Sequence, residues 1–261
     1  MYADYPLTTP PGIDDFEVRI APPSLLRRFL RPQVDSWIDG DQIIEALPLD
    51  QALACLESSL NLAVAHSDIA PLVLHSAVLE RHGRALVMPA PSGSGKSTLT
   101  AALAWRGWRL LSDEVTILCF ETGNLLANPR PVSLKNRSVD VVAAYEPRAQ
   151  FSRLIRGTSK GDIGYMRVPA DAVARMHETA APGLIVAPVF RAGAPVTVRP
   201  MERVEAFRWL TDNAVNYASM LQRGFNLVAD LVERSGLYTM TYSDLDEGIR
   251  ALGELHDRHA N

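Results

Sequence analysis

A glycine-rich segment between a predicted strand and a predicted helix constrains this chain more than any other feature. The segment reads APSGSGKS from Ala90 to Ser97. It matches the phosphate-binding loop pattern G-x-x-x-x-G-K-[ST], with alanine in place of the first glycine. Gly93 and Gly95 let the backbone curl so that successive N–H groups can point at phosphate oxygens. The segment therefore predicts a nucleotide-binding loop.

The flanking segments supply the strand and the helix that such a loop requires. PLVLHSAVLERHGRALVMPA, residues 71–90, gives two apolar runs around a turn at Arg81–Arg84, and the second run leads directly into the loop. Residues 97–106 are rich in alanine, leucine and threonine, and Gly107 stands where a helix C′ residue belongs. A Gly/Ser turn that carries Lys-Ser by chance is the alternative, and the flanking elements argue against it.

Each residue of the loop has a predicted role toward phosphate or metal. Lys96 is expected to reach the terminal phosphates, and the Ser97 hydroxyl can complete a Mg²⁺ shell. Backbone amides of the loop and of the first helical turn are expected to hold the β-phosphate. The predicted nucleotide-binding residues are Ser92, Gly93, Ser94, Gly95, Lys96, Ser97 and Thr98.

An acidic pair interrupts the next predicted strand, WRLLSDEVTILCF, residues 108–120. Asp113 and Glu114 follow Lys96 by one helix and one short strand, and we expect the end of that strand to lie beside the loop. A carboxylate there can point at the γ-phosphate, hold Mg²⁺, or take the proton from an attacking hydroxyl. A solvated acidic turn is the alternative.

The rest of the chain predicts a small N-terminal piece and a larger C-terminal part. Residues 16–23 and 33–48 alternate apolar and polar residues around an Asp39-Gly40 turn, which is typical of short half-buried strands, and residues 49–66 have helical spacing. We expect a β/α module over residues 1–70. The second domain is expected over residues 71–261 and ends in a helical extension.

The C-terminal part contains two predicted loops and four further elements. NPRPVSLKN (128–136) and RGTSKGDIGYM (156–166) are expected to be loops. Later elements are predicted as helices over about 204–216 and 220–235, a strand over 237–243, and a final helix beginning near Asp244. Three basic residues in loop-like stretches are candidates for steadying a γ-phosphate or a substrate, with exposed surface charge as the alternative: Arg130, Lys135 and Lys160.

Composition narrows the classes of protein that this chain can be. With 47% hydrophobic and 21% charged residues, it falls in the ordinary globular range. Its net charge of −4 gives no basic field for nucleic acid. The two cysteines, Cys55 and Cys119, lie among apolar residues and indicate buried thiols in a reducing compartment. The start lacks signal-peptide features and no apolar run approaches a membrane span. We expect a cytoplasmic protein.

At the level of family, the segment GSGKSTLTAALAWRGWRLLSDEVTI, residues 93–117, resembles the catalytic core of HPr kinase/phosphorylase. It is more similar still to the group called HprK-related kinase A, in which residues 107–114 and RPVSLKN (130–136) have counterparts. The resemblance is specific over about residues 74–136. It implies an α/β fold with a P-loop core like the C-terminal domain of HPr kinase, a mixed sheet, and a small β-rich N-terminal piece.

The resemblance also implies roles for single residues. Lys96 and Ser97 match the P-loop pair, Asp113 matches the carboxylate that serves as acid and base, and Glu114 replaces a second aspartate and is assigned to the metal. His75 falls where the family has a histidine before the loop strand; a structural histidine at a strand end is the alternative. The implied activity is Mg-ATP-dependent phosphorylation of a hydroxyl, serine by preference, on a protein or peptide, with ATP and Mg²⁺ as cofactors.

One departure from the family and two alternative functions stand beside that assignment. The family's C-terminal signature for the reverse, phosphorolytic reaction is not found, so forward kinase activity alone is expected. A P-loop small-molecule kinase would place an acid at the same position. A nucleotide-dependent switch or assembly ATPase ranks last, because the chain has neither a guanine-reading Asn-Lys-x-Asp nor an ABC-type Ser-Gly-Gly-Gln. The sequence leaves a homo-oligomer open.

Overall fold

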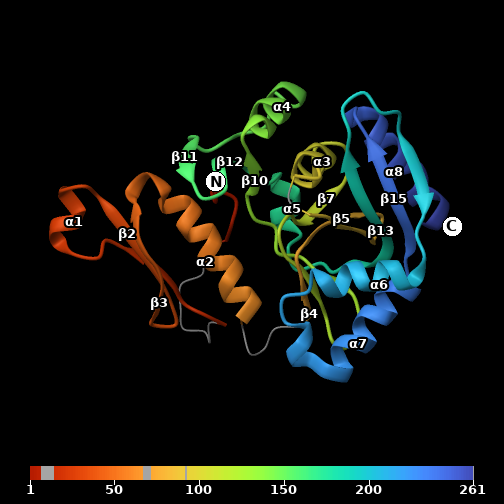
Figure 1. Ribbon diagram of the computed structural model, residues 1–261, viewed down its shortest axis with the longest axis horizontal. Helices are drawn as coiled ribbons and strands as arrows, with labels where there is room; N and C mark the ends of the chain where they lie inside the picture. Colours follow the sequence, from red (N-terminus) through yellow and green to blue (C-terminus); the bar gives the residue numbers. More distant parts are fainter. Residues whose placement is uncertain (7–14, 67–71, 92, 261) are drawn as a thin grey trace.

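The computed structural model describes residues 1–6, 15–66, 72–91 and 93–260. Its centre is a six-stranded mixed sheet with the strand order β14-β15-β13-β6-β5-β7 (Figure 1). β13 is parallel to both β6 and β15, whereas β5 is antiparallel to β6 and β7, and β14 is antiparallel to β15. The strands span Ser76–Arg81 (β5), Arg84–Pro89 (β6), Arg109–Ser112 (β7), Ala181–Phe190 (β13), Thr197–Pro200 (β14) and Gly236–Tyr242 (β15).

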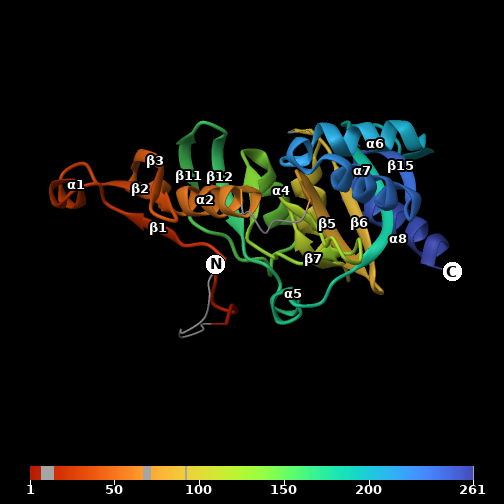
Figure 2. The same cartoon turned by 90° about the horizontal axis from the view of Figure 1, so that it is seen from below.

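Both faces of this sheet are buried, which gives a three-layer α/β arrangement. Leu86 and Met88 of β6 belong to the apolar cluster on one face, and Ala85 and Val87 belong to the cluster on the other. The first face packs against α3 (Lys96–Leu103) and α8 (Leu245–Ala260). The second packs against α6 (Arg203–Asp212) and α7 (Tyr217–Glu233), which lie together in Figures 1 and 2. Strands covered on both faces lose the apolar–polar alternation of half-buried strands.

Smaller elements complete the second apolar cluster and the region around it. A three-stranded antiparallel sheet with the order β4-β8-β9 packs against α7. It consists of Leu72–Leu74 (β4), Thr116–Leu118 (β8) and Leu125–Leu126 (β9), and the short helix α5 (Ala170–Ala174) packs in the first cluster. His75 separates β4 from β5, so the first apolar run of the predicted hairpin forms two strands in two sheets.

Two segments that the sequence predicted as loops form strands, so that prediction was wrong. β10 (Val132–Lys135), β12 (Gly161–Met166) and β11 (Ile155–Thr158) make an antiparallel sheet in that order, and α4 (Arg137–Tyr145) connects β10 to β11. Val132 and Leu134 alternate into the core. Gly161 has a φ of +90° and pairs with Thr158 across the hairpin turn.

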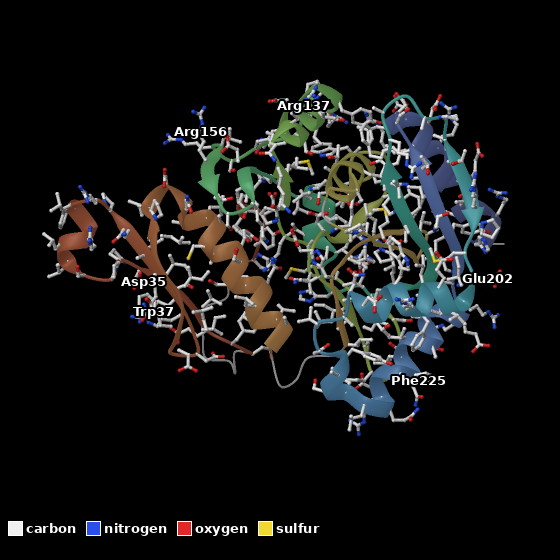
Figure 3. The ribbon with its side chains drawn as sticks, in the orientation of Figure 1. Asp35, Trp37, Arg137, Arg156, Glu202 and Phe225 are labelled. Carbon is white, nitrogen blue, oxygen red and sulfur yellow. The ribbon has the colours of Figure 1, made fainter. Side chains whose placement is uncertain are left out.

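The N-terminal residues form a separate antiparallel sheet covered by one helix. β1 (Val18–Ala21), β2 (Gln33–Ile38) and β3 (Asp41–Pro48) lie in that order, α1 (Leu25–Phe29) connects β1 to β2, and η1 (Leu49–Gln51) leads into α2 (Ala52–His66). Buried Asp35, labelled in Figure 3, accepts hydrogen bonds from Gln42 Nε2 and Ala46 N, both at 2.8 Å, where the β2–β3 register shifts. The predicted Asp39-Gly40 turn and the following helix are confirmed.

Most other predicted elements are also confirmed, but two strands of the central sheet, β13 and β14, were missed. The β5–β6 turn has positive φ at His82 and Gly83, as a two-residue hairpin requires. Gly107 follows α3 with a φ of +82°, and α6, α7, β15 and α8 match the four C-terminal elements. β13, at the centre of the sheet, was not predicted. Its APGLIVAPVF sequence is buried over seven consecutive residues and has no periodicity to detect.

Candidate active site

The glycine-rich segment forms a curled loop between β6 and α3. Gly93 and Gly95 have φ values of +87° and +89°, a backbone region that favours glycine, and Gly95 is the N-cap residue of α3. The first N–H groups of a helix have no partner within the helix. The amides of Ser97 and Thr98 therefore face the loop with their donors available, together with the positive end of the α3 dipole. Ser92 lies outside the described residues.

The ends of two distant strands hold this loop in place. Phe190 N, at the end of β13, donates a hydrogen bond to Ser94 O (2.8 Å). The Tyr242 hydroxyl, at the end of β15, donates to Gly95 O (3.0 Å). The two aromatic rings pack edge to face with centroids 5.7 Å apart. Sequence reasoning missed this contribution of the central sheet, because the two contacts join residues 96 and 147 positions apart.

Sheet order brings the acidic pair to the same edge as the loop. The acidic strand is not a direct neighbour of the loop strand, because β5 runs between β6 and β7. Since β5 is antiparallel to both, β6 and β7 are parallel to each other, and their carboxyl ends lie at one edge of the sheet. The amino end of β5, with His75 just before it, lies at that same edge.

Lys96 and Asp113 form the centre of the candidate site. Lys96 Nζ donates a hydrogen bond to Asp113 O at 2.6 Å and lies 3.9 Å from Asp113 Oδ1. Both side chains are buried. Neither carboxylate oxygen of Asp113 has a hydrogen bond of ordinary geometry with any described residue. Burial raises the pKa of Asp113, the charge of Glu114 raises it further, and the Lys96 ammonium opposes the rise.

His75 and Glu114 lie next to this pair. His75 Nδ1 is 3.1 Å from Glu114 O and 3.6 Å from Glu114 Oε2. The His75 side chain is half-exposed, and its backbone N–H donates to Asn213 O. Burial lowers the pKa of His75 and the Lys96 charge lowers it further, whereas Glu114 opposes the shift. The imidazole is therefore neutral at pH 7 and can serve as donor or acceptor.

A cavity of about 400 Å³ opens beside the acidic pair and reaches the N-terminal elements. Asp113 and Glu114 line one part of it, and no described residue of the glycine loop does. Glu57 and Asn61 of α2 line another part, beside the β11–β12 turn. Sequence reasoning missed these two residues. The signal was available, because polar residues four apart share one face of an otherwise apolar helix.

The three predicted basic residues occupy different positions. Arg130 and Lys160 line the cavity. Arg130 Nη2 donates to Asn61 Oδ1 and lies 3.8 Å from Glu57 Oε2. Lys135 is in β10 and is not among the residues lining the cavity, although it lies within electrostatic reach of Asp113, whose pKa it lowers. The structure thus brings two of the three residues to the acidic pair's cavity.

The donors at this site fit a magnesium ion bound together with phosphate. Within residues 1–6, 15–66, 72–91 and 93–260, no three His, Cys, Asp or Glu side chains cluster as a complete metal site. Mg²⁺ does not need such a cluster, because it is usually held by one or two carboxylates with phosphate oxygens and water. The Ser97 hydroxyl, which lies close to Asp113, and the Glu114 carboxylate next to Asp113 are oxygen ligands of that kind.

Comparisons with known proteins add one structural likeness. No family model and no curated protein matches this sequence. Among solved structures, the chain is similar to the HPr(Ser) kinase/phosphatase from Coxiella burnetii, at 15% identity and a TM-score of 0.30, over 70% of this chain and 96% of that one. A likeness at this level does not define the activity or the ligands of this chain. Across the described ranges, no helix is both long and apolar enough to cross a bilayer.

Proposed function

We propose that this protein is a Mg-ATP-dependent kinase that phosphorylates a hydroxyl group, serine by preference, on a protein or peptide. The observation that carries the proposal is the Asp113 carboxylate. It is buried beside the Lys96 ammonium, its oxygens have no hydrogen bond of ordinary geometry with any described residue, and Asp113 lines a cavity at the sheet edge where the glycine loop begins α3. A buried carboxylate whose hydrogen bonds are incomplete is costly to maintain, and such costs are typical of functional sites.

In this proposal the glycine loop and Lys96 bind the triphosphate. The amides of Ser97 and Thr98 and the α3 dipole favour anionic oxygens, and Lys96 Nζ has two donors besides the one used on Asp113 O. Ser97 and Glu114 are the proposed protein ligands of Mg²⁺. When bound, the ion neutralises charge on the β- and γ-phosphate oxygens.

Asp113 acts on the acceptor. The acceptor oxygen forms a bond to the γ-phosphorus, the bond from that phosphorus to the β–γ bridging oxygen breaks, and ADP leaves. The hydroxyl proton passes to Asp113 Oδ. The raised pKa of Asp113 makes it a better proton acceptor than an exposed aspartate, and phosphoryl transfer needs little early proton removal. His75, neutral at pH 7, positions Glu114 through the 3.1 and 3.6 Å contacts.

Nucleotide binding is the first test of this proposal. Isothermal titration calorimetry of Lys96→Met with Mg-ATP is expected to show loss of tight binding, because the substitution keeps the aliphatic stem and removes only the charge. Arg208→Ala, which changes an exposed pair with Asp212, is the matched charge control and should bind ATP as the unaltered protein does. If Lys96→Met binds Mg-ATP as tightly as the unaltered protein does, neither Lys96 nor the proposed site binds the nucleotide.

The direction of the reaction is a second part of the proposal. The segment 153–169 around β11 and β12 carries Lys160 but not the family's element for phosphorolysis. We expect forward transfer and little release of phosphate from the product as pyrophosphate. Phosphorylated acceptor incubated with enzyme, Mg²⁺ and millimolar phosphate tests this directly. Pyrophosphate formed as fast as the forward product would contradict it.

A further inference from the structure

We infer that the 400 Å³ cavity is the acceptor site and that it selects a hydroxyl compound carrying a carboxylate, which Arg130 and Lys160 bind. This inference rests on the proposed kinase activity and names its substrate class. The cavity lies near the lower end of the size range of small-ligand pockets, so it admits a group about the size of one residue and no folded domain. The carboxylate belongs either to a free hydroxy acid or to one end of an extended peptide.

The position of the cavity relative to Asp113 supports an acceptor role. Its lining includes Ser112, Asp113 and Glu114, and it lacks the described loop residues 93–97. Lys96 contacts the same Asp113 from the loop side through its 2.6 Å hydrogen bond. Asp113 is therefore shared between the proposed nucleotide site and the cavity. Both carboxylate oxygens of Asp113 are buried, so a hydroxyl in the cavity lies next to Asp113 and reaches these oxygens when the Asp113 side chain turns toward the cavity.

Arg130 supplies an unused donor for the acceptor's carboxylate. Its side chain is 13% exposed, and Nη2 is engaged by Asn61 Oδ1 and lies 3.8 Å from Glu57 Oε2. Nη1 is buried and has no hydrogen-bond partner among the described residues. A buried donor without a partner carries a desolvation cost, and a carboxylate oxygen removes that cost by accepting the hydrogen bond.

Lys160 provides a second cation on a fixed turn. It makes no ion pair within the described part of the chain, and its side chain reaches the cavity from the β11–β12 hairpin. The turn is held by Thr158 Oγ1, which donates to Gly161 O (2.6 Å) and accepts from Lys160 N (3.1 Å). The cavity lining therefore holds two cations and three carboxylates. Glu57 pairs with Arg130, the proposed function assigns Asp113 to the acceptor hydroxyl and Glu114 to Mg²⁺, and Lys160 has no ionic partner among the described residues.

The N-terminal module makes Arg130 available in the required position. The Tyr2 hydroxyl donates to Glu57 Oε1, and Tyr5 donates to Pro129 O (2.5 Å) next to Arg130. Gln51 Nε2 donates to Arg156 O (3.3 Å) on β11, where Arg156 is labelled in Figure 3. These contacts join the N-terminal module to the segment that holds Arg130 and to the β11–β12 hairpin, both of which line the cavity. Glu57 and Asn61 are thus positioning residues for Arg130, which gives the N-terminal module a role in acceptor recognition.

Radiolabelled transfer from [γ-³²P]ATP tests the inference in two arms. The first arm compares the hydroxy acids L-serine, L-homoserine and glycerate with serinol and glycerol, which lack the carboxylate. The second compares serine peptides whose terminal carboxylate is free with the same peptides amidated. The hydroxy acids or the free-acid peptides are expected to exceed their neutral partners by roughly ten- to hundredfold in kcat/KM, the range of one charged hydrogen bond. The arm that responds identifies the source.

Two variants connect that preference to the cavity. Arg130→Met and the exposed-site variant Lys160→Ala should each raise KM for the preferred acceptor at least about fivefold with a smaller change in kcat, leave ATP affinity unchanged, and reduce the preference for the carboxylate. Arg130→Lys should recover part of the loss. Equal transfer to neutral and carboxylate probes, or no transfer to either, in protein that binds ATP would overturn the acceptor assignment. If the unaltered protein does not bind ATP at all, the kinase proposal itself is overturned.

Discussion

Replacing Gly95 by alanine should destabilise the protein far more than the same change at Gly93. Both glycines have φ near +90°, so alanine at either position carries backbone strain of about 1–2 kcal/mol. The surroundings differ. A Cβ on Gly95 would lie 2.6 Å from the Tyr242 hydroxyl and 2.8 Å from Phe190 Cβ, whereas a Cβ on Gly93 would meet no atom of the described residues within 4 Å.

The magnitude follows from which of these atoms can move. The Tyr242 hydroxyl can swing away only by giving up its hydrogen bond to Gly95 O, which costs about 1 kcal/mol. Phe190 Cβ is attached to the backbone at the end of β13, so relieving that overlap requires a shift of the strand end or loop, at about 1–3 kcal/mol. We expect Gly95→Ala to lower the free energy of unfolding by about 3–6 kcal/mol and Gly93→Ala by about 1–2 kcal/mol.

Equilibrium urea unfolding of both variants measures this difference, and Tyr242→Phe supplies a second check. By itself, Tyr242→Phe should cost about 1 kcal/mol through the lost hydrogen bond. Combined with Gly95→Ala it should cost little or restore stability, because it removes the hydroxyl that the new Cβ meets at 2.6 Å. Equal losses for the two glycine variants, or additive losses in the double variant, would refute this account of how Tyr242 and Phe190 hold the loop.

Three further predictions concern buried charge. Asp113→Asn should slow phosphoryl transfer by roughly 10²–10⁴, yet raise the free energy of unfolding at pH 8. Burial raises the pKa of Asp113 in the folded protein, so the unaltered protein loses stability as pH rises and Asp113 ionises in the folded state. A lower free energy of unfolding for Asp113→Asn than for the unaltered protein at pH 8 would contradict this. The rings of His256 and Trp108 pack edge to face with centroids 5.0 Å apart. Burial lowers the pKa of His256, the charge of Arg81 lowers it further, and Asp257 opposes the shift. Stability should therefore fall as pH decreases through the unfolded value of about 6.5, and His256→Leu should flatten that profile in urea melts at pH 5–7.5; an unchanged slope would exclude His256 as its source. Glu80→Gln should lower the free energy of unfolding by about 3–5 kcal/mol, because it breaks a buried ion pair with Arg109 at 2.6 Å. Arg208→Ala, at an exposed ion pair, should change it by no more than about 0.5 kcal/mol in thermal melts, and similar values for the two variants would contradict the effect of burial.

Local patterns were enough to predict the elements that carry the candidate site. The β5–β6 turn and the helix after Gly95 follow from residues within a few positions of each other, because turn and helix preferences act over that range. The same local reading missed β10, β11 and β12, because it predicted loops over residues 128–136 and 156–166. Those strands form because they pair with each other and bury Val132, Leu134 and Tyr165, and burial depends on distant partners.

The sequence by itself determined the chemistry available at one end of the sheet. Gly93, Gly95 and Lys96 follow an apolar strand at a spacing that defines a turn and the start of a helix, and Asp113 follows the next apolar strand. These features depend only on neighbouring residues, and they supply two opposite charges. The tertiary structure alone decided how these groups meet. It inserted β5 between the two strands, buried the oxygens of Asp113 beside Lys96, and placed Glu57, Asn61 and Arg130 around one cavity. Those contacts join residues between 17 and 73 positions apart, and they exist because strand pairing and apolar burial, which no local pattern encodes, bring the segments together.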